Sequence, residues 1–262
     1  MKRMKSNNWC YLVGILPFII IMLIIAVVYS KSLKIEILLT FAAIMICVFV
    51  VKKFLCIPYS MKKYGEMKEI DMKLPDDWDI KIYSCKEMDR YPFLKRYIEI
   101  VSPLLPGKNS DVRVVVSPAF LKKYKPRFVE ICVTREILKY CRKVQIKLTL
   151  GLVIPILTWI IIIEAFFLSG WKDIFDRYSG ITNFFGPILT AAVIIITLFI
   201  WNKSVSQMDY QMDAELKNYY GDEVADYIRR WDEIMVPDDK ELIKKEKREI
   251  ELHYIRKRIE KL

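Results

Sequence analysis

The sequence predicts a mainly α-helical membrane protein with four transmembrane helices and a small α+β domain on the cytoplasmic side. The chain has 262 residues, of which 54% are hydrophobic. Each of four apolar runs is long enough to cross a bilayer, which takes roughly 20 helical residues, and core helices of soluble proteins are rarely so long and so apolar. The runs cover residues 9–29, 35–55, 148–168 and 181–201.

The first run contains no charged residue and follows a basic start, Met1 to Lys5. A cleaved signal peptide is the alternative, but the apolar stretch exceeds the about 7–15 residues usual in one. We therefore expect a retained anchor. Glu164, near the outer end of the third run, is a functional candidate as an intramembrane carboxylate. Its place near the interface favours a side chain that simply reaches out to water.

Basic residues set the orientation, because positive charge accumulates on the cytoplasmic side of membrane proteins. Of the 42 Lys and Arg residues, four lie in the loops within the two pairs of runs: Lys31, Lys34, Lys172 and Arg177. We therefore expect an integral protein of a bacterial cell membrane with both termini cytoplasmic. Its predicted parts are a transmembrane hairpin (1–56), a cytoplasmic α+β segment (57–147), a second transmembrane hairpin (148–201) and a helical segment that completes the domain (202–262).

The net charge of +11 could indicate a nucleic-acid binder, but it has a local explanation. Nearly all of the excess lies in segment 52–147, where basic clusters fall near the ends of the apolar runs. There they can meet anionic lipid headgroups, at about 1 kcal/mol per residue close to the surface. Aromatic and basic residues do not alternate as on a surface that stacks single strands. The expected partner is therefore the bilayer, and not nucleic acid.

In the cytoplasmic part before the third run, residues 79–84 alternate and predict a strand, as does the Val-rich stretch 111–116. Residues 86–100 predict a helix broken near Pro92. Ser117 and Pro118 are typical of an N-cap and a first helical turn, and predict a short helix over 119–124.

A longer helix is expected to begin around Pro126 and to run directly into the third span. Its buried stripe is predicted by spacings of three and four, and consists of Val129, Val133, Ile137, Tyr140 and Val144. Arg135, Lys139 and Arg142 fall on another face, which could simply be solvated.

After the fourth run, a helix is expected over 206–220, ending at Gly221. The next helix has an apolar face made of Val224, Tyr227, Ile228, Trp231 and Ile234. The charged tail has its own apolar stripe, too short for a coiled-coil partner and expected to pack on its own domain. That stripe consists of Leu252, Ile255, Ile259 and Leu262.

This order of parts resembles the membrane zinc metallopeptidases of the HtpX and CAAX prenyl protease type. In that family a Val-rich strand leads through a short helix to an H-E-x-x-H helix, and a Glu from an E-x-E-A-D motif after the last spans completes the zinc site. Here the strand 112–116, the helix 119–124 and the stretch 134–139 fall in matching places. The stretch 209–214 falls where E-x-E-A-D would be. The resemblance implies a metallopeptidase-like cytoplasmic domain.

The metal ligands that the resemblance implies are replaced in this chain. Arg135 and Lys139 stand where the family has its two histidines, and Asp209 stands for the ligand Glu. Glu136 matches the general base, and Asp213 matches an Asp that supports a histidine. Residues four apart on a helix can both ligate Zn²⁺, but two cations repel it, and the chain has one histidine, His253. We therefore expect no bound metal and no cofactor, with Glu136 vestigial or simply part of a surface ion pair.

We hypothesise that ion pairs replace the zinc site, with Arg135 and Lys139 facing Asp209 and Asp213. The alternative is that all four are independent surface residues. The resulting functional hypothesis is a catalytically inactive metallopeptidase-like protein that binds a peptide or membrane partner as a regulatory or accessory subunit. A peptidase with a non-standard site, using Glu136 or a cysteine such as Cys132 or Cys141, is a second possibility. A small transport or immunity component is a third.

Overall fold

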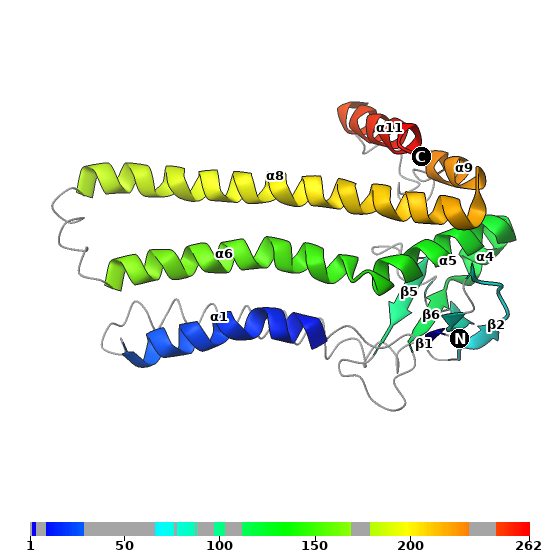
Figure 1. Ribbon diagram of the computed structural model, residues 1–262, viewed down its shortest axis with the longest axis horizontal. Coiled ribbons are helices and arrows are strands. Elements are labelled where there is room, and N and C mark those ends of the chain that lie inside the picture. The colour runs from blue at the N-terminus through cyan, green and yellow to red at the C-terminus, as the bar shows by residue number, and fades with distance from the viewer. Residues whose placement is uncertain are drawn as a thin grey trace. The chain divides into compact units, whose positions relative to one another are not determined.

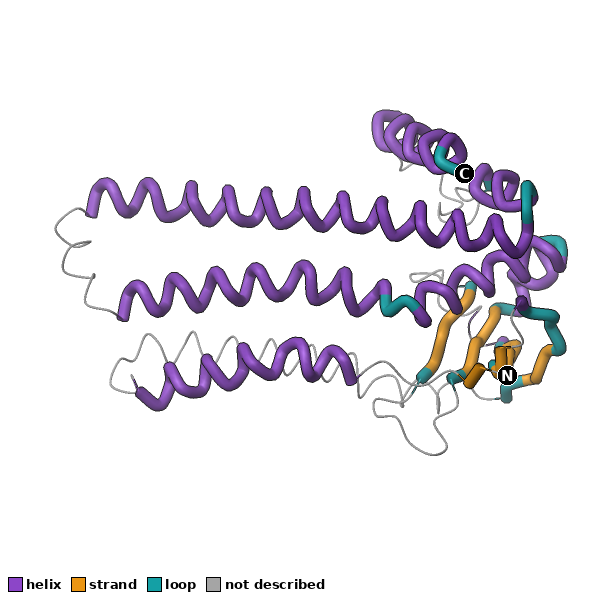
Figure 2. The backbone as a smooth tube through the Cα atoms, in the orientation of Figure 1, coloured by secondary structure: helices purple, strands orange, loops and turns teal. Residues whose placement is uncertain are grey.

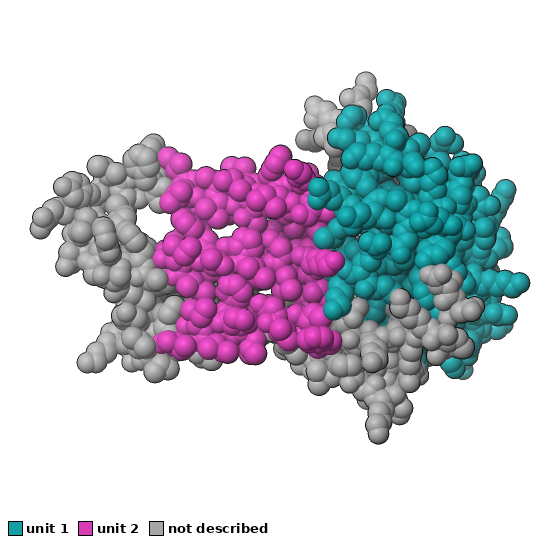
Figure 3. Space-filling model, viewed as in Figure 1, with its two compact units in different colours: residues 1–7, 56–144, 206–262 teal, residues 8–55, 145–205 magenta. Residues whose placement is uncertain are grey.

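The computed structural model describes residues 2–3, 9–28, 66–75, 78–86, 88, 97–102, 112–168, 179–230 and 245–262. The chain divides into two compact units, each built from segments distant in the sequence (Figure 3). Unit 1 comprises residues 1–7, 56–144 and 206–262, and unit 2 comprises residues 8–55 and 145–205.

Unit 2 is helical in its described parts, with contributions from α1 (Trp9–Val28), α6 (Val144–Leu168) and α8 (Ser179–Tyr220) (Figures 1 and 2). Among the described residues, two stretches are long and apolar enough to cross a membrane, judged by length and composition: Val144–Ile163 and Ile188–Tyr220. They correspond to the third and fourth predicted spans. The apolar part of α1 that meets the hydropathy criterion, Trp9–Ile21, is shorter. The second predicted span lies outside the described residues.

The helices of unit 2 are held by close backbone approach and by indole hydrogen bonds. A Cβ on Gly14 of α1 would lie 2.7 Å from the Leu150 side chain of α6, so glycine lets α1 approach α6 closely. The Trp201 indole donates to the Leu148 carbonyl at 3.0 Å, and the Trp159 indole donates to Thr190 Oγ1 at 3.3 Å. Both bonds join α6 to α8 within this unit.

Unit 1 contains a four-stranded mixed sheet in the order β2-β4-β6-β5, formed by Lys68–Ile70, Lys81–Ser84, Arg113–Val116 and Ile98–Val101. The central pair β4 and β6 is parallel, with Ile82 opposite Val114, and the two outer strands are antiparallel to it. A short parallel pair joins β1 (Lys2–Arg3) to β3 (Trp78–Asp79). The two predicted strands are thus confirmed.

The predicted helix over 86–100 is wrong at its end, because Ile98–Val101 is strand β5. This strand pairs with β6 in the register Ile98 to Val116. The stretch alternates apolar and charged residues only twice, which is too short to distinguish a strand from a helix. Pairing with a neighbouring strand therefore decides its conformation.

The helices α4 (Pro118–Lys123) and α5 (Pro126–Cys141) follow β6 directly. The predicted N-cap is confirmed, since Ser117 Oγ accepts a hydrogen bond from the Phe120 amide at 3.1 Å. The predicted continuity of α5 into the next span is wrong. Lys143 has φ 55°, a left-handed conformation that ends the helix before α6 begins at Val144.

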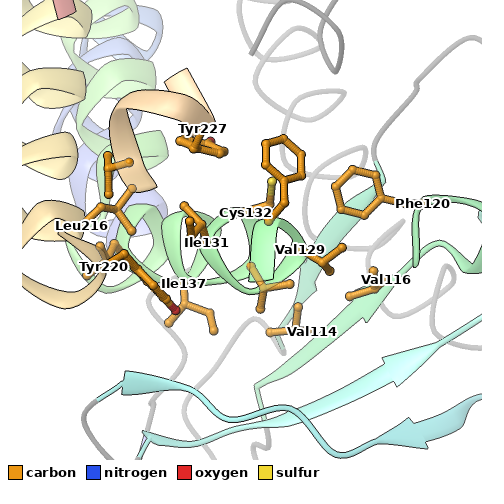
Figure 4. Packing of buried hydrophobic residues seen from close by; sticks show 14 of the residues in the cluster. Val114, Val116, Phe120, Val129, Ile131, Cys132, Ile137, Leu216, Tyr220 and Tyr227 are labelled. Atoms are coloured by element: carbon orange, nitrogen blue, oxygen red, sulfur yellow. The ribbon is translucent and has the colours of Figure 1, made fainter. Parts of the chain in front are cut away.

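One apolar core joins the sheet to the helices of unit 1. Figure 4 shows α5 between Val114 and Val116 of the sheet and Leu216, Tyr220 and Tyr227 of the later helices. Of the predicted stripe on α5, Val129, Val133 and Ile137 are fully buried. The helix α8 ends at Tyr220 as predicted, because Gly221 adopts φ 59°.

The described residues of unit 1 include two further helices after α8. The first, α9 (Glu223–Arg229), buries Val224, Tyr227 and Ile228, as its apolar face predicts. The second, α11 (Lys245–Glu260), is the charged tail, and its Ile255 joins the same core. Ile259 and Leu262 pack against this core as well, whereas Leu252 is 37% exposed. Most of the apolar stripe in the tail therefore packs on its own unit.

Candidate functional site

A buried cluster of charged side chains joins three helices of unit 1. Arg135 of α5 is 1% exposed, and its Nη2 donates to Asp209 Oδ1 of α8 at 2.6 Å. The Nε atom of Arg135 also lies 3.8 Å from Asp213 Oδ1, one helical turn further along α8. Arg135 therefore contacts both carboxylates of the sequence hypothesis. The alternative of a solvated cation is wrong for this residue.

The helix α11 supplies a second guanidinium that the sequence hypothesis did not include. Arg258 is 1% exposed and donates through Nε and Nη2 to the two carboxylate oxygens of Asp213, each at 2.7 Å. On the same helix, the Tyr254 hydroxyl donates to Asp209 Oδ2 at 2.7 Å. We call Arg135, Asp209, Asp213 and Arg258 the buried quartet.

Helical spacing brings these side chains together. Asp209 and Asp213 are four residues apart on α8, and Tyr254 and Arg258 are four apart on α11, so each pair shares one helix face. Next to Asp213 on α8, Met212 and Leu216 are buried in the same unit. Packing of the apolar neighbours thus carries the polar groups into the interior.

Formal charges in the buried quartet balance, with two guanidinium groups against two carboxylates. Burial is the largest influence on Arg135 and lowers its pKa, but the neighbouring Tyr227, Asp209 and Asp213 outweigh it, so the pKa is raised. Arg135 therefore stays charged in the interior. Removing one partner from such a buried pair typically costs about 3–5 kcal/mol, because the other charge is left without compensation.

Lys139 forms its ion pair with Glu136, three residues before it on α5. The hypothesis placed Lys139 against the carboxylates of α8. Its side chain is 28% exposed. Burial is the largest influence on the Lys139 amine and lowers its pKa, Glu136 raises it, the charge of Arg135 lowers it, and the charge of Asp209 on α8 also acts on the amine and raises it.

The cysteine alternatives for catalysis differ in their surroundings. Cys132 lies in the apolar core, and burial raises the pKa of its thiol far above the ordinary value. A thiol in that state holds its proton at neutral pH and is a poor nucleophile. Cys141, at the end of α5, is exposed. Cys132 is therefore a poor candidate for a catalytic nucleophile.

The residues of the buried quartet do not fit a zinc ion. A guanidinium has five donors and no lone pair for a metal, and the Arg135 guanidinium lies in contact with the carboxylate that would complete the site. Among the residues that the structure describes, no three His, Cys, Asp or Glu side chains form a group able to hold a metal. His253 is exposed on α11.

Sequence reasoning missed Arg258 and Tyr254. Arg258 belongs to the basic stretch Arg256-Lys257-Arg258, in which composition does not distinguish a buried residue from its exposed neighbours. Its position beside Ile255 and Ile259 of the apolar stripe is the one signal that could have found it. No family model, curated protein or solved structure matches this chain.

Proposed function

We propose that this chain is a catalytically inactive, metallopeptidase-like membrane protein that acts by binding, as a regulatory or accessory subunit. The observation that supports this proposal best is the bond between Arg135 and Asp209. These are two of the positions that the resemblance assigns to zinc ligands. In this chain they hold a cation and an anion that satisfy each other.

The proposed role of the buried quartet is to join helices, in the place where the zinc metallopeptidases have their catalytic metal site. A fixed guanidinium supplies the positive charge that a metal would supply, and holds α8 against α5. Glu136, the residue matching the general base, has Lys139 as its ion-pair partner. In the zinc enzymes the metal lowers the pKa of the water that the general base deprotonates, and the cations of Arg135 and Lys139 do not ligate a water in this way.

The proposed setting is the membrane of a bacterial cell, with four spans and both termini cytoplasmic. The distribution of Lys and Arg supports this orientation, and two helices have the length and hydropathy of spans. Anionic headgroups would then lie next to the basic segment 52–147. A partner protein or peptide in or beside the same membrane is the expected ligand of unit 1.

Rebuilding the ligand set tests the proposed ancestry. The full chain with Arg135→His, Lys139→His and Asp209→Glu should bind about one zinc per chain when refolded with the metal, because three ligands of a tetrahedral site are restored. A matched control places histidines at Arg142 and Lys143, outside the buried quartet. Metal content is measured by mass spectrometry, and folding by hydrogen exchange of the α5 amides.

Two results would contradict the proposal. A folded triple variant that holds no more zinc than the control would remove the relationship to zinc metallopeptidases. An unaltered chain that purifies with one zinc and cleaves peptides, with cleavage abolished by Glu136→Gln, would show an active enzyme.

A further inference from the structure

The C-terminal helix α11 contacts unit 1 through one face. Ile255 and Arg258 are buried on that face, with Tyr254, Ile259 and Leu262 partly buried. The other face is exposed at His253, Arg256, Lys257, Glu260 and Lys261. The part of the helix from residue 254 onward therefore contains the side chains that pack against the rest of unit 1.

Much of this contact is polar. Arg258 binds Asp213 through two hydrogen bonds, and Tyr254 donates to Asp209. At the end of the chain, Lys217 Nζ of α8 donates to the Leu262 carbonyl at 2.6 Å, and Lys261 Nζ lies 4.1 Å from the centre of the Tyr210 ring. The helix is thus bound to α8 through charge and hydrogen bonds, while Ile255, Ile259 and Leu262 pack on the apolar core of the unit.

Removal of α11 would leave one guanidinium, that of Arg135, against the two carboxylates of Asp209 and Asp213. The surface exposed on α8 would then present Asp213 without its bidentate partner, beside Lys217, whose amine would lose the Leu262 carbonyl. Both oxygens of Asp213 are oriented for the planar fork of a guanidinium. Such a bidentate pair selects arginine over lysine, whose ammonium is a point donor.

A polar contact of this kind contributes more to the choice of the binding partner than to the free energy that holds the two surfaces together. Buried ion pairs add little net stability, because the separated charges regain their hydration. The polar part of the α11 contact therefore costs less to open than an equal area of apolar core. Local opening of such elements occurs below the free energy of global unfolding.

We propose that α11 is an exchangeable cap over a receptor on α8 formed by the carboxylates of Asp209 and Asp213, and that an arginine-bearing helix of a membrane partner displaces it. Arg258 is the internal ligand that the arginine of the partner replaces, with Tyr254 and Ile255 defining the pattern of the helix. The inference rests on the proposed binding function and names the chemistry of the partner. It also assigns the C-terminal helix an autoinhibitory role.

A labelled synthetic peptide with the sequence of residues 245–262 tests the receptor. It should bind the full chain carrying Arg258→Ala at least about tenfold more tightly than the unaltered chain, because the resident helix competes less. The same peptide with Arg258→Ala or Arg258→Lys should lose at least about tenfold in affinity. A peptide with Arg256→Ala is the matched control, since Arg256 is exposed. Equal affinities for all four peptides would overturn the proposal.

Amide hydrogen exchange of the unaltered chain is a second test, which does not require the Arg258→Ala variant to fold. The α11 amides should exchange faster than those of α5, and the peptide should accelerate exchange in α11 while leaving α5 unchanged. If the α11 amides exchange only together with those of α5, and the peptide has no effect on their exchange, the proposal that α11 is an exchangeable cap is overturned. A rebuilt chain that binds zinc would still support the proposed ancestry in that case, so the two failures are distinguishable.

Discussion

Unit 1 has an apolar interior and a charged interior, and the charged one reaches the surface at Asp209, whose side chain is 18% exposed. The first is the apolar core between the sheet and α5, which includes the fully buried Val114, Val116 and Ile137 (Figure 4). The second is the buried quartet, where Arg135, Asp213 and Arg258 are no more than 1% exposed. Apolar burial contributes stability in proportion to area, whereas buried charges stabilise only as complete sets. The comparison indicates that the core holds the fold, and that the quartet determines which helices meet.

The strongest test of this contrast removes Asp213, which lies between two guanidinium groups. Asp213→Ala should lower the free energy of unfolding of unit 1 by about 3–5 kcal/mol, because two buried cations lose compensation. Exchange of the most protected α5 amides, measured in detergent, gives this free energy. A matched variant with Asp213→Leu and Arg258→Met removes one charge of each sign and should recover most of the loss. A loss below about 1 kcal/mol for Asp213→Ala would mean that the quartet is hydrated.

A smaller effect is expected at the edge of the quartet, where Tyr254 donates to Asp209. Tyr254→Phe should cost about 1.5–3 kcal/mol near pH 7, the usual range for a hydrogen bond to a charged group. Hydrogen exchange of the α11 amides measures it. Tyr254→Phe and the unaltered chain should be equally protected if the hydroxyl instead faces water.

The same residue predicts a dependence on pH. Burial, with the charge of Asp209, raises the pKa of the Tyr254 hydroxyl in the folded chain above its ordinary value of 10.0. The stability that this hydroxyl contributes is therefore present below pH 10 and is lost as the pH rises toward the folded pKa. The difference between the unaltered chain and Tyr254→Phe should narrow above pH 10. A constant difference from pH 8 to pH 11 would contradict this sign.

The least effect is expected from an exposed ion pair between the end of α5 and α8. Nε of Arg142, the residue that follows α5, donates to Glu215 Oε2 of α8 at 2.7 Å, but the arginine side chain is 42% exposed. Water screens such a pair, so Arg142→Gln should change the free energy of unfolding by less than about 1 kcal/mol. A larger loss, also measured on the α5 amides, would show that charge pairs act alike whether exposed or buried.

Local sequence patterns predicted those helices, strands and caps whose conformation depends mainly on their own residues. The Val-rich strand β6, the Ser117 cap and the end of α8 at Gly221 each have a sequence signal with a physical cause. The break at Lys143 has no such signal, because neither Arg142 nor Lys143 disfavours a helix. Strand β5 depends on pairing with β6, which a pattern of four residues does not show.

The buried quartet was predictable only in part. The order of segments placed Arg135 near Asp209 and Asp213, since the hypothesis treated them as one former site. Two features of the site depend on how helices distant in the sequence pack together. Lys139 pairs with Glu136 of its own helix, and Arg258 of α11 binds Asp213. One basic residue among several in the tail becomes buried because Ile255 and Ile259 orient that face of α11 toward the core.

A double-mutant cycle between Arg135 and Asp209 tests the central claim most directly. The cycle compares Arg135→Met, Asp209→Leu and the double variant with the unaltered chain, with the unfolding free energy of unit 1 measured on the α5 amides. A cluster that takes the place of a metal site should give a coupling energy of about 2–3 kcal/mol. A coupling near zero would mean that the two residues act independently, and would contradict the proposed replacement.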